Sequence, residues 1–192
     1  MVGNISNYTK IDILRCFLAI EKNISRNELV QKLDLGEGTI RTILDILKEK
    51  QYIRSTRQGH SLTKKGILAR NRIYQSIILP KRLLVSIYPN YKKIGVVIKN
   101  IEKKRITIEK RDIAIKNGAE GCLIFNYSNN KLQLLIFPFK QNFDELKNHF
   151  HFNEGDILIV TFANSFKWAE ISALAVVLEL HKELKKIFNS FY

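Results

Sequence analysis

Hydrophobic residues in the first part of the chain recur with helical spacing. Ile11, Leu14 and Leu18 lie three and four residues apart, so a helix over residues 8–22 places them on one face. Thr9 precedes this apolar stripe and is a suitable N-cap, because its hydroxyl can accept a hydrogen bond from a free backbone N–H of the first turn. The pattern therefore predicts a helix of about four turns here.

Two further helices are predicted after this one, with a short turn between them. Ser25 and Glu28 have the spacing of a capping box, in which each side chain accepts a hydrogen bond from the backbone N–H of the other residue. Leu35-Gly36 ends the second helix, and a third helix follows over residues 37–50. The third helix places its apolar residues on one face: Ile40, Ile43, Leu44, Ile46 and Leu47.

The pattern changes from helix to strand after the third helix. Residues 52–57 are rich in β-forming residues, Gln58-Gly59 is a tight-turn signal, and residues 60–62 can return as a second strand. Thr63 then caps a fourth helix over residues 64–77. This order of elements is that of a winged helix-turn-helix: a helix, a helix–turn–helix, a hairpin and a final helix.

Apolar runs bounded by turn residues predict about five strands and three helices in the rest of the chain. The expected strands cover residues 81–88, 94–98, 121–127, 132–137 and 156–161. The expected helices cover residues 109–116, 144–150 and 166–188. We therefore expect an α+β or α/β protein. An N-terminal winged helix-turn-helix over residues 1–78 should precede a smaller-sheet α/β domain over residues 79–192.

Composition places the chain among ordinary folded proteins. Of its 192 residues 45% are hydrophobic, which is enough to bury a core. No apolar run reaches the ~18 residues that cross a membrane, and the first residues lack the basic and apolar regions of a secretory signal. Cys16 and Cys122 have no metal-motif spacing. We expect a cytoplasmic protein that uses no membrane, metal or cofactor.

Positive charge is concentrated in one part of the chain. The formal net charge is +14, and eleven basic residues face only two acidic residues between Arg41 and Arg82, a local charge of +9. A basic surface favours a polyanionic partner, usually nucleic acid and sometimes an anionic membrane surface. The alternative explanation is that the richness in Lys and Ile reflects genomic composition or heat adaptation.

A resemblance to winged-helix transcriptional regulators covers about residues 8–75. It rests on the segment LDLGEGTIRTILDILKEKQYIRSTRQGHSLTKKG, in which residues 62–66 (LTKKG) match the L-T-x-x-G element that such regulators often carry. The later segments EKRDIAIKNGAEGCLIFNY and GDILIVTFANSFKWAEISALAVVLEL are similar to the C-terminal domain of archaeal two-domain winged-helix proteins of uncharacterised function. This resemblance implies a regulator and names no ligand. The archaeal CTP-dependent riboflavin kinases can also carry an N-terminal winged helix, but their glycine-rich nucleotide segment is not evident here.

The third helix of a winged helix-turn-helix enters the major groove of DNA with its N-terminal residues nearest the base edges. Thr39, Arg41 and Thr42 are therefore the base-reading candidates, and Arg41 can bond a guanine at two positions. Glu37 can accept a hydrogen bond from cytosine or simply favour the helix N-terminus. A solvated position on the polar face of a helix is the alternative for each of them.

Further polar and basic residues around that helix are candidates for contacts to the DNA backbone. Those that can reach a minor groove or the phosphates lie in the hairpin: Arg54, Arg57, Gln58 and His60. Those expected to contact phosphates alone lie on the third and fourth helices: Lys48, Lys64 and Lys65. Phosphate contacts add affinity but carry no sequence information.

Candidate ligand-binding residues in the second domain carry weaker signals. Glu109, Arg111 and Asp112 form a charged cluster at a helix start, where capping and ion pairing are the simpler role. Asn126 and Asn164 lie at or just past strand ends, where open α/β sheets often bind ligands, although a turn or a cap is the simpler role there too. No phosphate-binding loop and no catalytic set of residues stands out.

These features together predict a cytoplasmic, sequence-specific DNA-binding transcriptional regulator and not an enzyme. Double-stranded DNA is the expected partner. A homodimer is also expected, because dimers place two recognition helices on two half-sites. The second domain is expected to dimerise, to sense a small-molecule effector, or both. One alternative is an enzyme with a winged-helix regulatory module. Another is an assembly module whose winged helix binds another protein.

Overall fold

A computed structural model describes residues 8–99, 101, 106–136 and 143–191 of the chain. The chain divides into two compact units, and each is treated by itself. The first runs to Arg72 and also includes the chain from Lys186 onward, whereas the second runs from Ile73 to Lys185. The expected domain boundary between residues 78 and 79 falls inside a strand.

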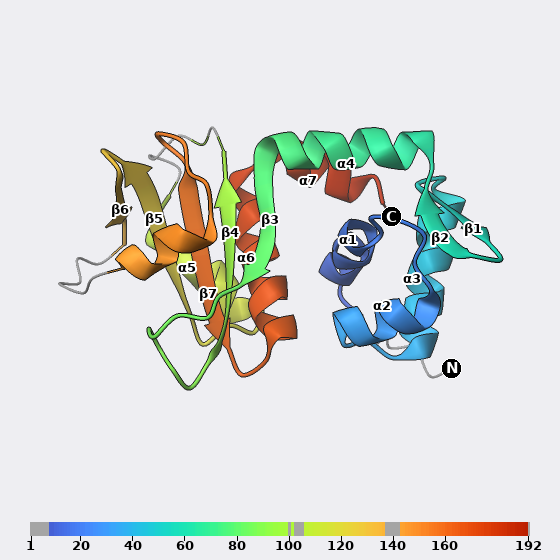
Figure 1. The fold of residues 1–192 in the computed structure, drawn as a ribbon, viewed down its shortest axis with the longest axis horizontal. Coiled ribbons are helices and arrows are strands. Elements are labelled where there is room, and N and C mark those ends of the chain that lie inside the picture. The colour runs from blue at the N-terminus through green and yellow to red at the C-terminus, as the bar shows by residue number, and fades with distance from the viewer. Residues whose placement is uncertain (1–7, 100, 102–105, 137–142, 192) are drawn as a thin grey trace. The chain divides into compact units, whose positions relative to one another are not determined.

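The first unit contains three helices, an antiparallel hairpin and the start of a fourth helix, in the order that the hydrophobic pattern predicts (Figure 1). The elements are α1 (Lys10–Ala19), α2 (Arg26–Leu33), α3 (Glu37–Glu49), β1 (Ile53–Thr56), β2 (Gly59–Leu62) and α4 (Lys64–Ser76). α1 is shorter than expected at both ends. The other helices begin and end within two residues of their predicted bounds.

Two of the helix starts are capping boxes. The Ser25 hydroxyl accepts from the Glu28 backbone N–H at 3.2 Å, and Glu28 Oε2 accepts from the Ser25 N–H at 2.8 Å, as predicted. These hydrogen bonds to Ser25 hold the pKa of Glu28 below its ordinary value. Thr9 caps α1 in the same way, with Asp12 as the reciprocal acceptor. Local sequence therefore fixes where α1 and α2 begin.

The end of the chain packs in the core of the first unit. The fully buried Phe191 ring lies 4.8 Å from the ring of Phe17 and 4.8 Å from the ring of Tyr52, centroid to centroid. The Tyr52 hydroxyl also forms a 2.7 Å hydrogen bond with the Ser190 hydroxyl. The last helix expected from sequence ends at residue 188, so the packing of this ring was not predicted; the core of the first unit buries it completely.

The second unit is built on a five-stranded sheet with strand order β3-β4-β7-β5-β6. The strands are β3 (Ile77–Arg82), β4 (Lys92–Ile98), β5 (Gly121–Ser128), β6 (Lys131–Leu134) and β7 (Ile157–Ala163). Every neighbouring pair is antiparallel, so the expected α/β sheet is wrong and the fold is α+β. β4 and β5 do run in the same direction, as a strand–helix–strand pattern suggests, but β7 lies between them.

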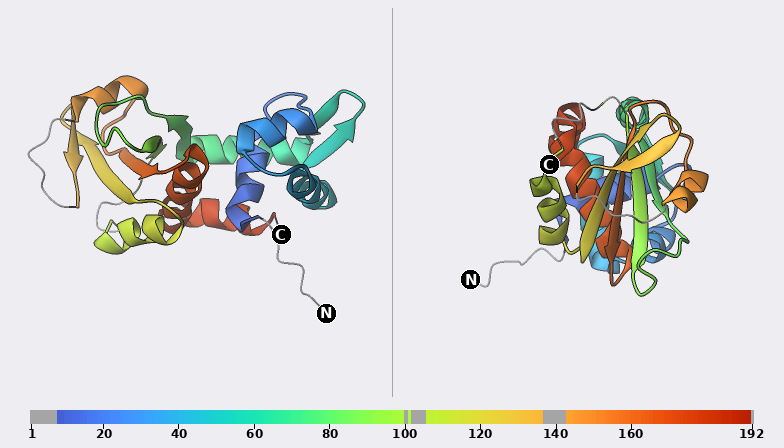
Figure 2. Two further views of the ribbon diagram at one scale, coloured as in Figure 1. Left: turned by 90° about the horizontal axis from the view of Figure 1, so that it is seen from below. Right: turned by 90° about the vertical axis from the view of Figure 1, so that its left-hand side faces the viewer.

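Helices and loops cover the two faces of this sheet. α6 (Phe166–Leu180) packs on β4 and β7, and α5 (Ile108–Lys116) packs on β5. The short helix η2 (Asp144–His149) lies on the other side, as Figure 2 shows. That side holds an apolar core, here called the Phe-rich cluster: Leu83, Ile87, Val97, Leu123, Phe125, Phe143, Leu146, Phe150, Leu158, Val160 and Phe162.

Three elements of the second unit differ from the prediction by three residues or more at a boundary. The strand expected over residues 81–88 is instead β3 at Ile77–Arg82, so only residues 81 and 82 of the prediction are strand. The long helix expected over residues 166–188 is two helices, α6 and α7 (Lys182–Asn189), separated by an extended His181. Apolar spacing continues across the break and therefore does not reveal it. The strand expected over residues 132–137 is β6, which ends at Leu134, and residue 137 lies outside the described residues. No helix in the described part of the chain is long and apolar enough to cross a membrane.

Candidate functional site

α3 buries one face and exposes the other. The buried face is the predicted one, apart from the half-buried Ile46: Ile40, Ile43, Leu44 and Leu47. Arg41, Thr42 and Lys48 are exposed on the opposite face, and Thr39 is half-buried beside them. The Thr42 hydroxyl donates to the Gly38 carbonyl at 3.1 Å. α3 thus offers solvent a polar surface with guanidinium, ammonium and hydroxyl donors.

Glu37 is engaged at the N-terminal end of this surface. Its Oε1 lies 2.9 Å from Nη1 of Arg26 on α2 and 3.8 Å from Nη2 of Arg41 on α3. The side chains of all three residues are at least 39% exposed, so solvent screens both pairs. Glu37 thus lies between two exposed guanidinium groups and contributes little to the stability of the fold.

The β1–β2 hairpin places its exposed residues next to α3. Arg54 lies opposite Ser61 in the register, and its Nε donates to the Ser61 hydroxyl at 3.2 Å. Arg57 and Gln58 form the exposed turn. Gly59 has a φ of 118°, and a Cβ there would lie 2.6 Å from the Ile24 carbonyl oxygen, so the turn requires glycine.

His60 connects the hairpin to the chain before α2. Its backbone exchanges two hydrogen bonds with Ile24, at 2.8 and 3.0 Å, and its Nδ1 lies 2.9 Å from the Ser55 hydroxyl. Burial lowers the pKa of His60, and the positive charges of Arg26 and Lys48 lower it further. The imidazole is therefore a neutral, half-buried group within a basic environment at pH 7.

The LTKKG element has a structural explanation. The Thr63 hydroxyl accepts from the Gly66 N–H at 3.1 Å and donates to the Gln51 carbonyl at 2.7 Å, so it caps α4 as predicted. A Cβ on Gly66 would lie 2.1 Å from the Tyr52 carbonyl oxygen. Lys65 donates to the Lys50 carbonyl at 2.8 Å and lies 4.4 Å from the centroid of the Tyr52 ring. The element therefore fastens α4 to the end of α3.

The structure gives different surroundings to Lys64 and Lys65, for which the sequence predicts the same role. Lys65 is already bound to the scaffold, whereas Lys64 is an exposed first residue of α4. A hydrogen bond to a backbone carbonyl limits how far the Lys65 ammonium can move toward a phosphate. Of the two, Lys64 is the better placed for an electrostatic contact.

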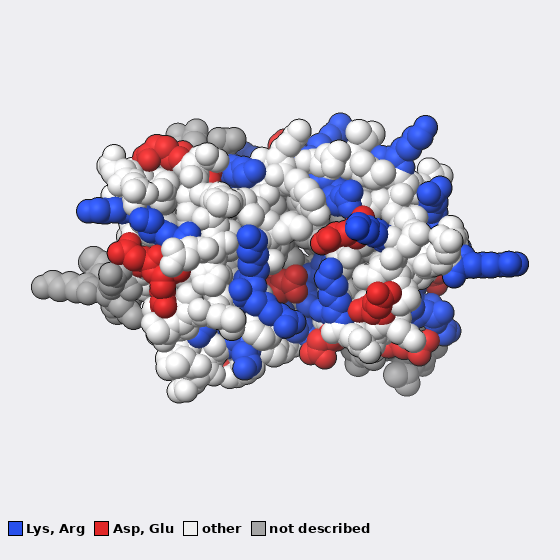
Figure 3. Space-filling view, viewed as in Figure 1, with Lys and Arg blue, Asp and Glu red and all other residues white. Residues whose placement is uncertain are grey.

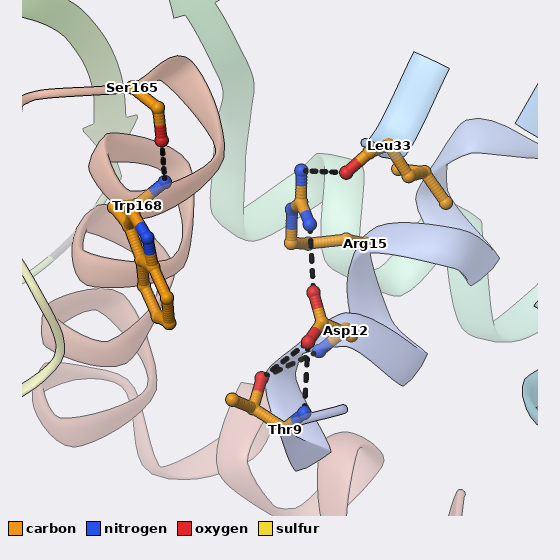
Figure 4. A network of polar contacts seen from close by, with 6 residues as sticks. All are labelled: Thr9, Asp12, Arg15, Leu33, Ser165 and Trp168. Carbon is orange, nitrogen blue, oxygen red and sulfur yellow. Dashed lines mark hydrogen bonds and ion pairs between the residues drawn. The ribbon is translucent and has the colours of Figure 1, made fainter. Parts of the chain in front are cut away.

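A buried ion pair that the sequence analysis did not single out holds α1 to α2 (Figure 4). Arg15 Nη1 lies 2.7 Å from Asp12 Oδ1, and its Nη2 donates to the Leu33 carbonyl at 3.1 Å. Both side chains are only 2% exposed. Leu33 ends α2 just before the turn into α3, so this pair sets the position of that turn. The signal was present, because Asp12 and Arg15 interrupt an otherwise apolar helix.

The candidate residues on α5 differ in their exposure to solvent. Glu109 and Asp112 are exposed, and Arg111 is half-buried. Thr107 is the N-cap residue of α5, but its side chain makes no capping hydrogen bond. Their arrangement is that of a solvated helix start.

Asn126 and Asn164 lie at opposite ends of β7. Asn126 is paired with Ile157, the first residue of that strand, whereas Asn164 follows Ala163, the last residue. Neighbouring antiparallel strands end at opposite edges of a sheet, so the two amides are not brought together. Asn164 is exposed and donates to Glu120 Oε1 at 2.9 Å.

Asn126 is fully buried, on the sheet face that α5 and α6 cover. Leu123 and Phe125 point into the Phe-rich cluster, so Asn126 points to the other face. Neither its Oδ1 nor its Nδ2 has a hydrogen-bond partner within the described residues. A buried amide without a partner is costly, which makes Asn126 the most unusual polar group of the second unit.

The two cysteines are buried in separate cores. Burial raises the pKa of both Cys16 and Cys122 to about 12, so both are thiols at neutral pH. Within the described ranges, His, Cys, Asp and Glu side chains form no group of three that could hold a metal ion.

Two family models match parts of the chain. Residues 10–68 match a model described as "PH0730-like, N-terminal domain", and residues 89–180 match "Domain of unknown function (DUF4443)". A solved structure, hypothetical protein PH0730 from Pyrococcus horikoshii OT3, has 28% sequence identity and a TM-score of 0.80. The similarity covers 97% of this chain and 100% of that one. No curated protein matches. This chain therefore shares its fold with the Pyrococcus protein over nearly its whole length.

Proposed function

We propose that the first unit is a winged helix-turn-helix that binds double-stranded DNA, and that the protein regulates transcription. In this proposal α3 lies in the major groove, where Arg41 and Thr42 face the base edges and Thr39 lies beside them. The β1–β2 hairpin contacts a minor groove or the phosphates through Arg54 and Arg57.

The exposed polar face of α3 carries the proposal. It contains donors that read base edges, and the residues behind it are fully apolar, so the helix is fixed in place without using that face. The exposed basic residues Lys48, Arg54, Arg57 and Lys64 follow on the same helix, the hairpin and the start of α4. A helix fixed by its buried face, beside several exposed cations, suits the binding of duplex DNA.

For the second unit we propose a role in joining two copies or in sensing a small effector. A dimer would place two α3 helices on two half-sites about one helical turn apart. The buried amide of Asn126 supports an internal polar site in this unit, since an unpartnered donor and acceptor can be satisfied by a bound molecule.

The test is selection of bound sequences from a random duplex pool by the full chain. We expect a defined motif, with half-sites about 10 base pairs apart if the protein is a dimer. Titration of the selected duplex should give a binding constant whose logarithm falls linearly with the logarithm of salt concentration. A pool that stays random, or no duplex binding at low salt, would rule the proposal out. A stable protein partner in that case would favour the assembly module.

A further inference from the structure

Two cations of the second unit lie against one aromatic ring. The Arg82 guanidinium carbon lies 4.3 Å from the centroid of the Phe166 ring, and the Lys92 ammonium lies 5.8 Å from the same centroid. Arg82 ends β3, Lys92 begins β4, and Phe166 begins α6 just after β7 ends at Ala163. Three neighbouring strands thus bring these groups to one end of the sheet. Figure 3 shows Lys and Arg side chains gathered over this end of β3.

A second pair continues the same surface along α6. The Lys167 ammonium lies 5.8 Å from the centroid of the Trp168 ring, and Trp168 is 43% exposed. We call the five residues Arg82, Lys92, Phe166, Lys167 and Trp168 the Phe166 patch. It alternates cations with aromatic rings, which is the composition of surfaces that bind nucleic-acid strands.

No ion pair in the described chain neutralises the cations of this patch. Arg26 and Lys185, by contrast, are paired with Glu37 and Glu179. The first turn of α6 contains no acidic residue. The cations are held by rings, which orient them and leave their charge uncompensated. Such a charge attracts an anion from solution.

We propose that the Phe166 patch binds the phosphodiester backbone of nucleic acid. Arg82, Lys92 and Lys167 would supply the charge, and the exposed Trp168 ring would supply an apolar contact to sugar or base. The inference rests on the proposed function, because it takes the same DNA as the partner. It adds that the second unit contributes to affinity but not to sequence preference, since phosphate contacts carry no sequence information.

Trp168 is the single tryptophan of the chain, so its fluorescence reports on this patch alone. The full chain is titrated with a labelled duplex of about 40 base pairs, which exceeds the span of one winged-helix site. Anisotropy of the label and tryptophan emission are recorded together. We expect emission to change as the duplex saturates. We also expect the Arg82→Ala/Lys92→Ala variant to lower the magnitude of the salt slope by roughly 1–2 while its preferred sequence stays the same.

The matched control is Lys131→Ala, because Lys131 is an exposed lysine on β6, at the opposite edge of the sheet. It should keep the wild-type slope and emission change. Lys92→Gln is the milder variant if the double variant unfolds early, and it should lower the slope by about 1.

The possible results separate the two proposals. Suppose that the wild type binds the duplex with unchanged Trp168 emission, and that the Arg82→Ala/Lys92→Ala variant keeps the wild-type salt slope. That result overturns this inference and leaves the proposed function standing. Absence of any duplex binding by the wild type overturns both. If phosphatidylglycerol vesicles change Trp168 emission in salt where the duplex does not, the partner is a membrane surface and the inference is wrong.

Discussion

The Glu37 carboxylate lies 3.8 Å from Nη2 of Arg41, one turn further along α3, and 2.9 Å from Nη1 of Arg26 on α2. Arg41 is 65% exposed, so the pair contributes little to stability. The carboxylate nevertheless lies beside the Arg41 guanidinium on the exposed face of α3. A base that Arg41 reads must therefore compete with Glu37 for the same donors.

Replacing Arg41 with Ala should weaken binding to the selected duplex by ~1–3 kcal/mol and relax specificity at one base pair. The reason is that a guanidinium can bond one base at two positions, and Ala cannot. The measurement is anisotropy titration against the selected duplex and its single-base variants. Equal affinities of Arg41→Ala and wild type for all of them would show that Arg41 does not read a base.

Glu37→Gln is the companion variant, because it keeps the side-chain size and removes the charge. It should strengthen binding to every duplex, since one anion near the phosphates is gone. If Glu37 accepts from a cytosine instead, the variant should lose discrimination at that position.

Gly66→Ala should lower the free energy of unfolding by ~1–3 kcal/mol or more. The added Cβ would lie 2.1 Å from the Tyr52 carbonyl oxygen, and neither backbone can move without breaking the contact of α4 with α3. Gly38→Ala is the matched control, because nothing lies within 4 Å of a Cβ there. That change on α3 should raise stability by about 0.4–1 kcal/mol. Urea unfolding measures both, and equal effects of the two changes would contradict the packing argument.

Asp12→Ala should cost ~3–5 kcal/mol of stability, because it leaves the Arg15 charge buried without its carboxylate. The double variant Asp12→Ala/Arg15→Met should recover part of that loss, since no charge then remains in the core. Thermal and urea unfolding of the two single variants and the double variant give the coupling energy. Additive losses would mean that the pair does not act as a unit.

Asn126→Val should raise the free energy of unfolding by about 1 kcal/mol, since a buried amide without partners is replaced by an apolar strand former. Asn126→Asp should lower it, because a carboxyl is costly in the same place. Urea unfolding of the purified protein measures both. A clear loss of stability in Asn126→Val would mean that the amide has a bound partner, and would favour the effector site.

The affinity for duplex DNA should rise as pH falls into the range in which His60 binds a proton. Burial and the nearby Arg26 and Lys48 hold the pKa of His60 below its ordinary value of 6.5, so the free protein carries a neutral imidazole. A phosphate nearby favours the protonated ring, so DNA binding takes up a proton. Titrations of the duplex at several pH values test this. The His60→Gln variant should lose the part of the pH dependence of affinity that comes from His60. If His60→Gln keeps the wild-type pH dependence of affinity, another group takes up the proton.

The same depressed pKa has the opposite effect on stability. As pH falls through the ordinary pKa of histidine, the unfolded chain binds a proton before the folded chain does, so the folded state loses stability in that window. The difference in unfolding free energy between wild type and His60→Gln should therefore stay constant above about pH 6.5 and change below it, as the wild type loses stability. Binding and stability thus change in opposite directions over one pH range.

Most elements could be placed from sequence because their causes are local. The Ser25–Glu28 capping box lies within one helical turn, and the buried face of α3 follows from residues three and four apart. The motif at residues 62–66 was recognised as a pattern, but its reason lies in the Tyr52 carbonyl, fourteen residues before Gly66. Sequence likewise could not distinguish Lys64 from Lys65, because the acceptor for Lys65 is the Lys50 carbonyl.

The sequence by itself determined the element order of the first unit, its helix starts to within two residues and the basic segment, since each depends on residues close along the chain. Tertiary structure decided that β7 lies between β4 and β5, that Asn126 is buried and far from Asn164, and that Phe191 packs on Phe17. These outcomes depend on contacts between residues distant in sequence. Many alternative pairings of strands and side chains would bury a similar apolar area. Only the packed fold selects among them.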